Sequence, residues 1–351
     1  MSQLFQQFLN EVGVNRPSDA MPAHLFPVKN RVATIGTIGA GKSTVVAGMV
    51  MAAETLVADD PSFYCSVIES TSDIHQDVSS LRDGHFPKKT VPFGTYASEA
   101  GLLLEYDRKL GGIRYGVKRV QNPVCDIAGE DLAQTIRQVR MAGPIGNVAR
   151  QAVRNLIAYV RESDAFIITV KATRAKGLFP LGRQLETEEP DKPEDQRVLS
   201  DDPDVNLVRL LEDLINYKRT HRSRPIRGVA VVVTAWDRLK QSGVADRIGF
   251  DILNPHVGQQ DLQNFVRGCF PAVYAAIKSL RIPNVQYFPS FFELETDEQG
   301  NEKRWPDGSP IIKTRAETAG HPDEWWRDLR KCSYSEDTYI KLDKWLLSFG
   351  E

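Results

Sequence analysis

Residues 31–44, with the sequence RVATIGTIGAGKST, constrain the fold of this chain more than any other segment. A β-branched run at 32–35 precedes a glycine-rich turn, and an apolar run at 45–57 follows it. Four residues fill the spacing G-x-x-x-x-G-K-[S/T]: Gly36, Gly41, Lys42 and Ser43. A turn of this kind between a strand and a helix is the context that a phosphate-binding loop requires. The segment therefore predicts a strand, a glycine loop and a helix, in that order.

The glycine loop predicts contacts with the phosphates of a nucleotide. Glycines allow backbone N–H groups to turn inward around phosphate oxygens, and the following helix directs its positive end at the same oxygens. Lys42 is expected to reach the terminal phosphates, and the Ser43 hydroxyl to bind Mg2+. The residues expected to contact the nucleotide here are Gly36, Gly39, Ala40, Gly41, Lys42, Ser43 and Thr44. The alternative, a glycine-rich turn with a lysine by chance, does not explain the flanking strand and helix.

Length and composition set broad limits. The 351 residues permit one enlarged domain or two small ones. A hydrophobic content of 41% is ordinary for a globular protein, and a formal net charge of -2 argues against a chain that binds polyanions over its whole surface. No apolar run has membrane-spanning length, and no N-terminal signal pattern is present. The scattered cysteines lack C-x-x-C and the histidines lack metal-ligand spacing, so a reduced, cytoplasmic protein without disulfides or zinc is expected.

The chain divides at the start of the glycine-loop strand. Residues 1–30 read as a helix and a proline-containing linker, and residues 31–351 as one domain. The amphipathic helix at 2–12 either packs on the domain or binds a partner. Insertions are expected near 171–204, which is proline-rich and aperiodic, and near 291–315, which reads as a hairpin.

The order of the other predicted elements indicates the fold class. Strands are predicted at 63–68, 102–108, 113–120, 165–170, 228–234 and 285–288. Helices are predicted at 72–82, 131–142, 147–162, 205–222, 259–280 and 336–349. The runs at 165–170 and 228–234 are continuously apolar, as in strands buried on both faces. The pattern predicts an α/β fold, namely a doubly wound, mostly parallel sheet flanked by helices.

A second motif, D-x-x-G, follows the predicted strand at 113–120. Asp126 can hold Mg2+ through a water molecule, and the amide of Gly129 can donate a hydrogen bond to a γ-phosphate. Pro123 indicates that this strand has a bulge or lies at a sheet edge, because proline donates no ladder hydrogen bond.

A threonine hydroxyl between the glycine loop and this motif can also bind Mg2+ when a γ-phosphate is present. Thr90 is favoured for this position, in competition with Thr71 and Thr95.

Two further features follow later strands: Thr234-Ala-Trp-Asp237 after the strand at 228–234, and Ser290 after the last strand. Together, the motifs resemble those of the P-loop GTPases of the translation-factor and Ras-like (TRAFAC) class. The resemblance covers roughly residues 31–350. Within that class, the chain looks like poorly characterised prokaryotic GTPase-domain proteins. The resemblance implies that GTP and GDP are the nucleotides, that Mg2+ is the cofactor, and that a protein effector or regulator is a partner.

The resemblance also implies roles at the phosphates. Lys42 would neutralise β- and γ-phosphate charge, Ser43 and Thr90 would coordinate Mg2+, and Asp126 would hold the ion through water. Gly129 would sense the γ-phosphate.

At the base, Asp237 would accept hydrogen bonds from guanine N1–H and the exocyclic amine, and Ser290 would lie in the loop that backs the ring. The family pattern is [N/T]-K-x-D, so Thr234 matches and Ala235 replaces the lysine whose stem covers the ring. Trp236 either stacks on the base instead or belongs to the core or an interface.

Glu130 stands where Ras-like members carry a glutamine that orients the attacking water. The carboxylate of Glu130 either orients water or acts as a base, or it simply starts the next helix near the positive end of that helix. Lys42 and Thr90 are the other catalytic candidates. The reaction expected is attack of water on the γ-phosphate. Contacts with the γ-phosphate would order the loops around Thr90 and Gly129, and hydrolysis would release them, so that the protein acts as a nucleotide-dependent switch.

Two other functions fit parts of the sequence. A small-molecule or nucleotide kinase, or an ATPase, also uses a glycine loop, and Arg174 and Arg183 can supply lid arginines, but a kinase has no use for Thr234-x-x-Asp237. A nucleotide-binding interaction module with little hydrolysis is compatible with Glu130 and Ala235. An arginine finger is not assigned, although Arg82 lies near the relevant loop.

Charge is unevenly distributed along the chain. Residues 131–183 contain nine Lys/Arg and three Asp/Glu, a net of +6, and residues 184–204 contain two Lys/Arg and nine Asp/Glu, a net of -7. The basic region 137–183 either forms a solvated helix face beside an acidic loop, or it is a surface for an anionic partner, and the acidic loop covers that surface.

Overall fold

The computed structural model describes residues 32–36, 39–68, 73–87, 101–110, 113–123, 163–175, 178, 207–208, 211–212, 226–240, 257–316 and 330–349. The predicted N-terminal helix and linker, the helices at 131–142 and 147–162, and most of the insertion at 171–204 lie outside these residues.

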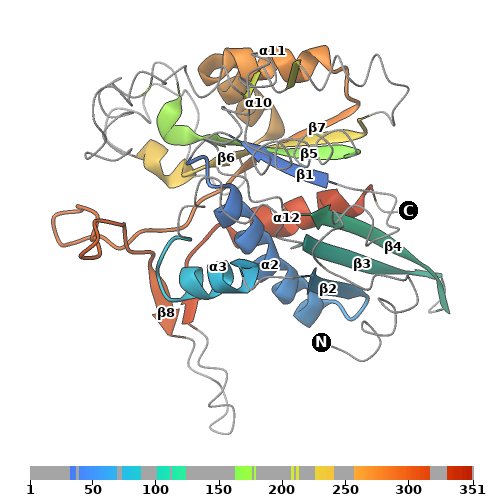
Figure 1. The fold of residues 1–351 in the computed structure, drawn as a ribbon, viewed down its shortest axis with the longest axis horizontal. Helices are drawn as coiled ribbons and strands as arrows, with labels where there is room; N and C mark the ends of the chain where they lie inside the picture. Colours follow the sequence, from blue (N-terminus) through green and yellow to red (C-terminus); the bar gives the residue numbers. More distant parts are fainter. Residues whose placement is uncertain are drawn as a thin grey trace, which may run out of the picture.

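A four-stranded parallel sheet forms the centre of the molecule (Figure 1). Its strands are ordered β1-β5-β6-β7 and comprise Val32–Gly36, Ala165–Lys171, Gly228–Thr234 and Asn284–Pro289. The residues of β1 and β6 are all buried, and those of β5 are buried up to its last residue. Continuous apolar runs are the pattern that burial on both faces requires, so the two strongest strand predictions are confirmed.

Helices cover both faces of this sheet (Figure 1). Helices α2 (Lys42–Asp59) and α12 (Glu336–Leu347) pack on one face, and α10 (Gln259–Cys269) and α11 (Pro271–Ser279) pack on the other. Strand side chains alternate between two cores: Ile167, Ala230 and Val232 face the α2 side, whereas Phe166, Val229 and Val231 face the α10 side. The predicted α/β class, with a parallel sheet flanked by helices, is therefore confirmed.

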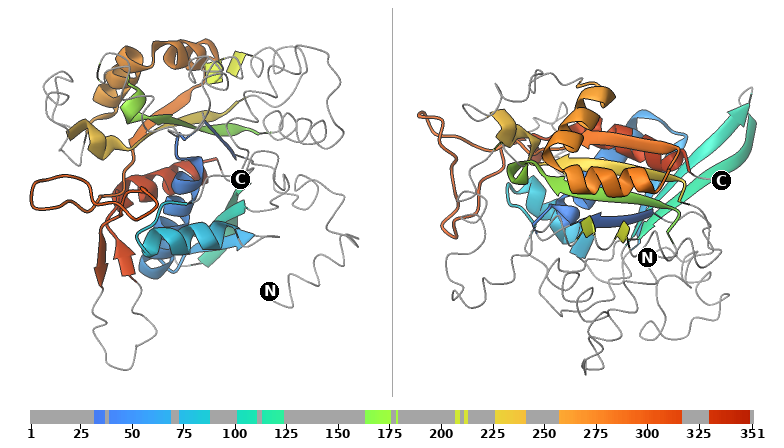
Figure 2. Two further views of the ribbon diagram at one scale, coloured as in Figure 1. Left: turned by 60° about the vertical axis from the view of Figure 1, so that its left-hand side comes forward. Right: turned by 90° about the horizontal axis from the view of Figure 1, so that it is seen from above.

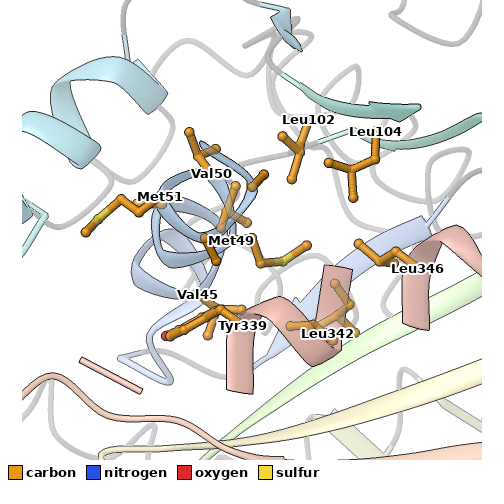
Figure 3. Packing of buried hydrophobic residues seen from close by; sticks show 14 of the residues in the cluster. Val45, Met49, Val50, Met51, Leu102, Leu104, Tyr339, Leu342 and Leu346 are labelled. Atoms are coloured by element: carbon orange, nitrogen blue, oxygen red, sulfur yellow. The ribbon is translucent and has the colours of Figure 1, made fainter. Parts of the chain in front are cut away.

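A second, antiparallel sheet lies beside α2 in the order β2-β3-β4. Its strands are Phe63–Ile68, Gly101–Leu110 and Ile113–Pro123. Figure 3 shows side chains of β3 and of α12 gathered around α2 in one core: Leu102 and Leu104 from β3, and Tyr339, Leu342 and Leu346 from α12. The predicted hairpin is confirmed, and Pro123 ends an outer strand opposite Gly101, whereas the register shift lies at Arg108/Lys109.

The helix predicted at 259–280 is wrong as a single element. It is divided at Phe270, whose φ of -130° and ψ of 56° lie outside the helical region. Pro271 causes the division, because its ring disfavours helical geometry in the residue before it while its fixed φ suits the first turn of a new helix. The result is two shorter helices, α10 and α11, on the same face of the sheet.

Helix α3 (Asp73–Arg82) ends at Gly84, as predicted. Gly84 has a φ of +86°, and the amides of Gly84 and His85 donate to the carbonyl oxygens of Leu81 and Ser80 at 3.1 and 2.8 Å. This pair of bonds is the usual way for a left-handed glycine to satisfy the last carbonyl groups of a helix.

Residues 291–313, which we call the arm, follow β7. Phe292 and Ile312, near its two ends, are buried in the core on the α2 side, and the middle of the arm extends outward from the molecule (Figure 2). Antiparallel bridges join Leu294 to Ile312 and Thr296 to Glu302, and the Asp297 carboxylate accepts hydrogen bonds from two amides of the predicted turn. The hairpin prediction for this insertion is therefore confirmed. Short strands β8 (Thr314–Ala316) and β9 (Arg330–Cys332) pair after it. None of the helices that the structure describes has the length and apolar character needed to cross a lipid bilayer.

Candidate nucleotide site

The predicted site segments converge at one edge of the parallel sheet. Lys171 pairs with Thr234, and Val233 pairs with Pro289, so β5, β6 and β7 end side by side. Strand β1 ends nearby at Gly36, which lies opposite Thr169. In open α/β sheets, ligands bind in the crevice beyond the carboxyl ends of the strands.

Backbone geometry at the glycine loop depends on glycine at three positions. A Cβ atom at Gly36 would lie 1.9 Å from the Oγ1 atom of Thr169, so a side chain does not fit there. Gly39 and Gly41 have φ angles of 63° and 77°, in the left-handed region that glycine adopts without strain. The chain then enters α2 at Lys42, so Gly39, Ala40 and Gly41 lead directly into the positive end of a long helix.

The side chain of Lys42 lies over this loop. Its Nζ atom donates to the carbonyl oxygen of Gly36 at 3.4 Å, so the ammonium spans the loop from its last residue to its first. Ala40 of the loop is buried, whereas Ser43 and Thr44 are half-buried on the first turn of α2. The loop therefore combines an ammonium and a helix N-terminus, the two groups that attract phosphate.

Thr234 connects the loop to the end of β6. Its hydroxyl lies 3.0 Å from the carbonyl oxygen of Ala40 and 3.3 Å from that of Val170. Its methyl group would be 3.4 Å from a Cβ at Gly41. Thr234 is buried, so this contact fixes the glycine loop against the segment that carries Asp237.

Asp237 lies in the 3-10 helix η3 (Trp236–Lys240) directly after β6. Only 16% of its side chain is exposed. Burial raises the pKa of its carboxyl above the ordinary aspartate value, and the Arg238 guanidinium and two backbone amides oppose this shift. Arg238 lies 4.0 Å from the carboxylate and forms a second ion pair with Glu302 of the arm.

The structure decides between the two interpretations of Trp236. Its side chain is 2% exposed and packs edge-on against Phe265 of α10, with 5.1 Å between ring centroids. The indole belongs to the core on the α10 face of the sheet, so it does not replace the missing lysine as a cover for a base. Ala235 has a φ of 53°, which turns the chain sharply between Thr234 and Trp236.

Ser290 is buried at the end of β7. Its amide donates to the carbonyl oxygen of Val233 at 2.8 Å, and its own carbonyl oxygen accepts from the amide of Trp236 at 3.1 Å. The hydroxyl lies 2.5 Å from the hydroxyl of Tyr339. The backbone of Ser290 thus supports the turn that presents Asp237.

Several predicted residues lie outside the described part of the chain: Thr90, Asp126, Gly129, Glu130 and Arg183. The basic region 137–183 is described only at 163–175 and 178, so its anionic partner stays a prediction. Arg174 lies half-buried in the 3-10 helix η2 (Ala172–Arg174), and Arg82 is paired with Glu54 of α2. Among the described residues, no three His, Cys, Asp or Glu side chains are grouped to hold a metal ion.

Sequence reasoning missed Thr169, which Gly36 accommodates, and Tyr339, which contacts Ser290. Thr169 is the single polar residue in the buried run of β5, and its hydroxyl lies 3.3 Å from the carbonyl oxygen of Ile35. That isolated threonine is a signal for a specific contact, whereas Tyr339 resembles any aromatic residue of a helix core. A scan against models of protein families and a search of curated proteins both find no match to the chain.

Proposed function

We propose that the protein binds GTP with Mg2+ and hydrolyses it to GDP and phosphate, as a nucleotide-dependent switch. The observation that carries this proposal is the Thr234 hydroxyl, 3.0 Å from the carbonyl oxygen of Ala40. It joins a loop suited to phosphates to a segment suited to guanine. A nucleotide needs these two sites at a fixed spacing, and a chance glycine turn does not need the second.

At the phosphate end, the chain supplies charge and backbone donors that are already in position. Lys42 and the start of α2 favour the negative charge of a triphosphate. Because the loop is fixed at Gly36 and Ala40, little reorganisation is required when charge develops on the γ-phosphate during hydrolysis.

The residues present suit Mg2+, because hydroxyl and carboxylate oxygens are the ligands that this ion prefers. Ser43, half-buried on the first turn of α2, would hold it together with Thr90 and Asp126. When bound, Mg2+ neutralises phosphate charge. Glu130 is proposed to orient the attacking water, and Thr90 and Gly129 to respond to the γ-phosphate.

At the base end, Asp237 is proposed to accept from the N1–H and exocyclic amine of guanine. Adenine has no donor at N1 and would leave this mostly buried carboxylate without those bonds. Neither Ala235 nor the core residue Trp236 covers the ring, so we expect weaker base affinity than a lysine at position 235 would give.

The absence of a lysine at position 235 also favours a second candidate, a nucleotide-binding interaction module that hydrolyses little GTP. The two candidates make the same binding predictions and differ in turnover. A single-turnover assay of phosphate release separates them, and a measurable rate that depends on Lys42 supports the hydrolase.

The proposal predicts that Lys42→Ala weakens GTP binding at least tenfold and abolishes hydrolysis while the fold persists, since the ammonium lies over the loop and not in a core. The measurement is a titration with a fluorescent GTP analogue, with circular dichroism on the same sample. Lys341→Ala, an exposed lysine of α12, is the matched control and should behave like the parent. Unchanged binding by Lys42→Ala would refute the phosphate-loop assignment.

A further inference from the structure

We propose that Tyr339 is a positioning residue for the base end of the site and that it sets the preference for guanine through Ser290. This inference rests on the proposed GTP-binding function. Tyr339 lies on α12, far along the chain from both motifs, and its side chain is fully buried. Figure 3 shows its ring beside α2.

The ring of Tyr339 packs directly on the backbone of the phosphate-loop helix. A Cβ atom at Gly48 of α2 would lie 2.6 Å from the Cζ atom of the tyrosine, so only glycine leaves room for the ring at this distance. Gly48 follows Lys42 on the same helix. The position of Tyr339 is therefore fixed by the element that begins at the phosphate loop.

Neighbouring rings hold the tyrosine in one orientation. Its ring centroid is 6.1 Å from that of Phe292 and 5.7 Å from that of Tyr334, both tilted relative to it. A ring packed against a helix on one side and two aromatic rings on others has little freedom to rotate its hydroxyl away.

The hydroxyl of Tyr339 reaches the base loop. It lies 2.5 Å from the Oγ atom of Ser290, and both side chains are buried. Ser290 in turn bonds through its backbone to Val233, at 2.8 Å, and to Trp236, at 3.1 Å. Tyr339 thus reaches, through Ser290, the residues on either side of Thr234 and Ala235, and Asp237 follows Trp236 directly.

The hydroxyl is not required for packing. A phenylalanine would fill the same space in the surrounding apolar cluster, and a buried hydroxyl costs free energy unless it is bonded. Burial raises the pKa of Tyr339 well above its ordinary value, so the group is neutral and acts as a hydrogen-bonding partner, not as an acid or base. What the hydroxyl adds is a fixed distance between α2 and the loop of Ser290.

Thr234 and Tyr339 therefore make two separate connections between the phosphate and base ends. Thr234 joins them directly, through its hydrogen bond to Ala40, and Tyr339 joins them through the core formed by α2 and α12. Loss of the second connection should loosen the turn that carries Asp237 while it leaves the glycine loop in place. The consequence is specific: binding that depends on the base weakens, and binding that depends on phosphate alone does not.

The test compares Tyr339→Phe with Tyr334→Phe by calorimetric titration with GTP, ATP and inorganic tripolyphosphate. Tyr334 is the matched control, because it is in the same aromatic cluster but its hydroxyl lies 3.4 Å from Glu336 and not on Ser290. For Tyr339→Phe we expect GTP affinity to fall about three- to tenfold, in the range of one hydrogen bond, with tripolyphosphate affinity unchanged. Tyr334→Phe should leave the ratio of GTP to tripolyphosphate affinity at the parent value.

Ser290→Ala provides a second test of the same path. If Tyr339 acts through Ser290, the double variant should lose no more GTP affinity than either single variant, because one bond is removed in all three. Additive losses would overturn the inference, as would equal losses for GTP and tripolyphosphate in Tyr339→Phe. If the parent binds GTP and Tyr339→Phe binds it with the same affinity, this inference is overturned and the proposed function is not. If the parent binds no nucleotide, both the proposed function and this inference are overturned.

Discussion

At the scale of single residues, the most unusual group is the carboxyl of Asp343 on α12. It is fully buried, and neither of its oxygens has a hydrogen-bond partner in the part of the chain that the structure describes. Burial raises its pKa well above the ordinary value. Two other titratable groups face it: Cys65 of β2, whose pKa is raised to about 12 by burial and by Asp343, and Tyr334 after β9.

This burial predicts that Asp343 destabilises the protein at neutral pH. Because the pKa is higher in the folded state than in the unfolded chain, the folded state holds the proton more tightly, and above the ordinary aspartate pKa folding is coupled to proton uptake that costs free energy. Below the ordinary aspartate pKa of about 4, both states are protonated and the cost vanishes. Asp343→Leu should therefore raise the free energy of unfolding by about 1–3 kcal/mol at pH 7, with a smaller gain at pH 4.

Urea unfolding at both pH values measures this effect. Asp59→Leu, at an exposed position near the end of α2, is the control and should change stability by less than about 0.5 kcal/mol. A loss of stability in Asp343→Leu at pH 7 would contradict the prediction and show that the carboxyl stabilises the folded state.

At the scale of elements, the sequence was most informative where one local signal dominated. The boundaries of β2 and β6 were predicted from their apolar and β-branched runs, and the end of α3 from Gly84. The prediction of one helix at 259–280 was wrong because the periodic apolar pattern continues across Pro271, where the structure begins a new helix. The contact between Ser290 and Tyr339, 49 residues apart, depends on how α12 packs and has no local signal.

In the candidate site, too, local motifs were predictable from the sequence and contacts between distant segments were not. The spacing of Gly36, Gly41 and Lys42 indicated the loop, because that motif is local. The bond from Thr234 to Ala40 joins segments 194 residues apart, and sheet order alone brings them together. The side chain of Trp236 left two interpretations open, since an aromatic residue suits either a base or a core until its neighbours are known.

The arm contacts the segment that leads toward Thr90. The Trp305 Nε1 atom and the Ile312 amide donate to the carbonyl oxygen of Gly84 at 3.3 and 2.9 Å. The Trp305 ring stacks on His85 with 4.1 Å between centroids. Through Glu302, the same arm also pairs with Arg238 beside Asp237. One element thus contacts both the end of α3 and the ion pair beside Asp237.

We predict that Trp305→Ala loosens the segment 84–87 without unfolding the sheet, because it removes the stacked ring and one of the two donors to Gly84. Hydrogen exchange should show at least tenfold less protection of the Ile312 and His85 amides, with β6 unchanged. Lys303→Ala, an exposed residue of the same arm, is the control and should leave both amides protected. Equal protection in Trp305→Ala and the parent would mean that the remaining bonds hold the segment alone.

At the scale of the whole molecule, the fold brings residues of four strand ends to one edge of the parallel sheet. The glycine loop follows β1, and η2 and Asp237 follow β5 and β6, while Ser290 follows β7. Two cores, one on each face of the sheet, fix these ends relative to one another. This edge of the sheet can recognise a guanine nucleotide only if Asp237 binds the base.

The most direct test of the GTP-binding proposal is therefore competition of GTP, ATP and xanthosine triphosphate against a labelled nucleotide, for the parent and for Asp237→Asn. The titration is best done at pH 8, because burial raises the pKa of Asp237 and its ionised form is the acceptor. Asp261→Asn, an exposed position in the first turn of α10, is the control. If the GTP-binding proposal is correct, the parent and the control prefer GTP, and Asp237→Asn prefers xanthosine triphosphate, whose base presents a carbonyl where guanine has its amine. A parent that prefers ATP, or an Asp237→Asn variant that keeps its preference for GTP, would contradict it.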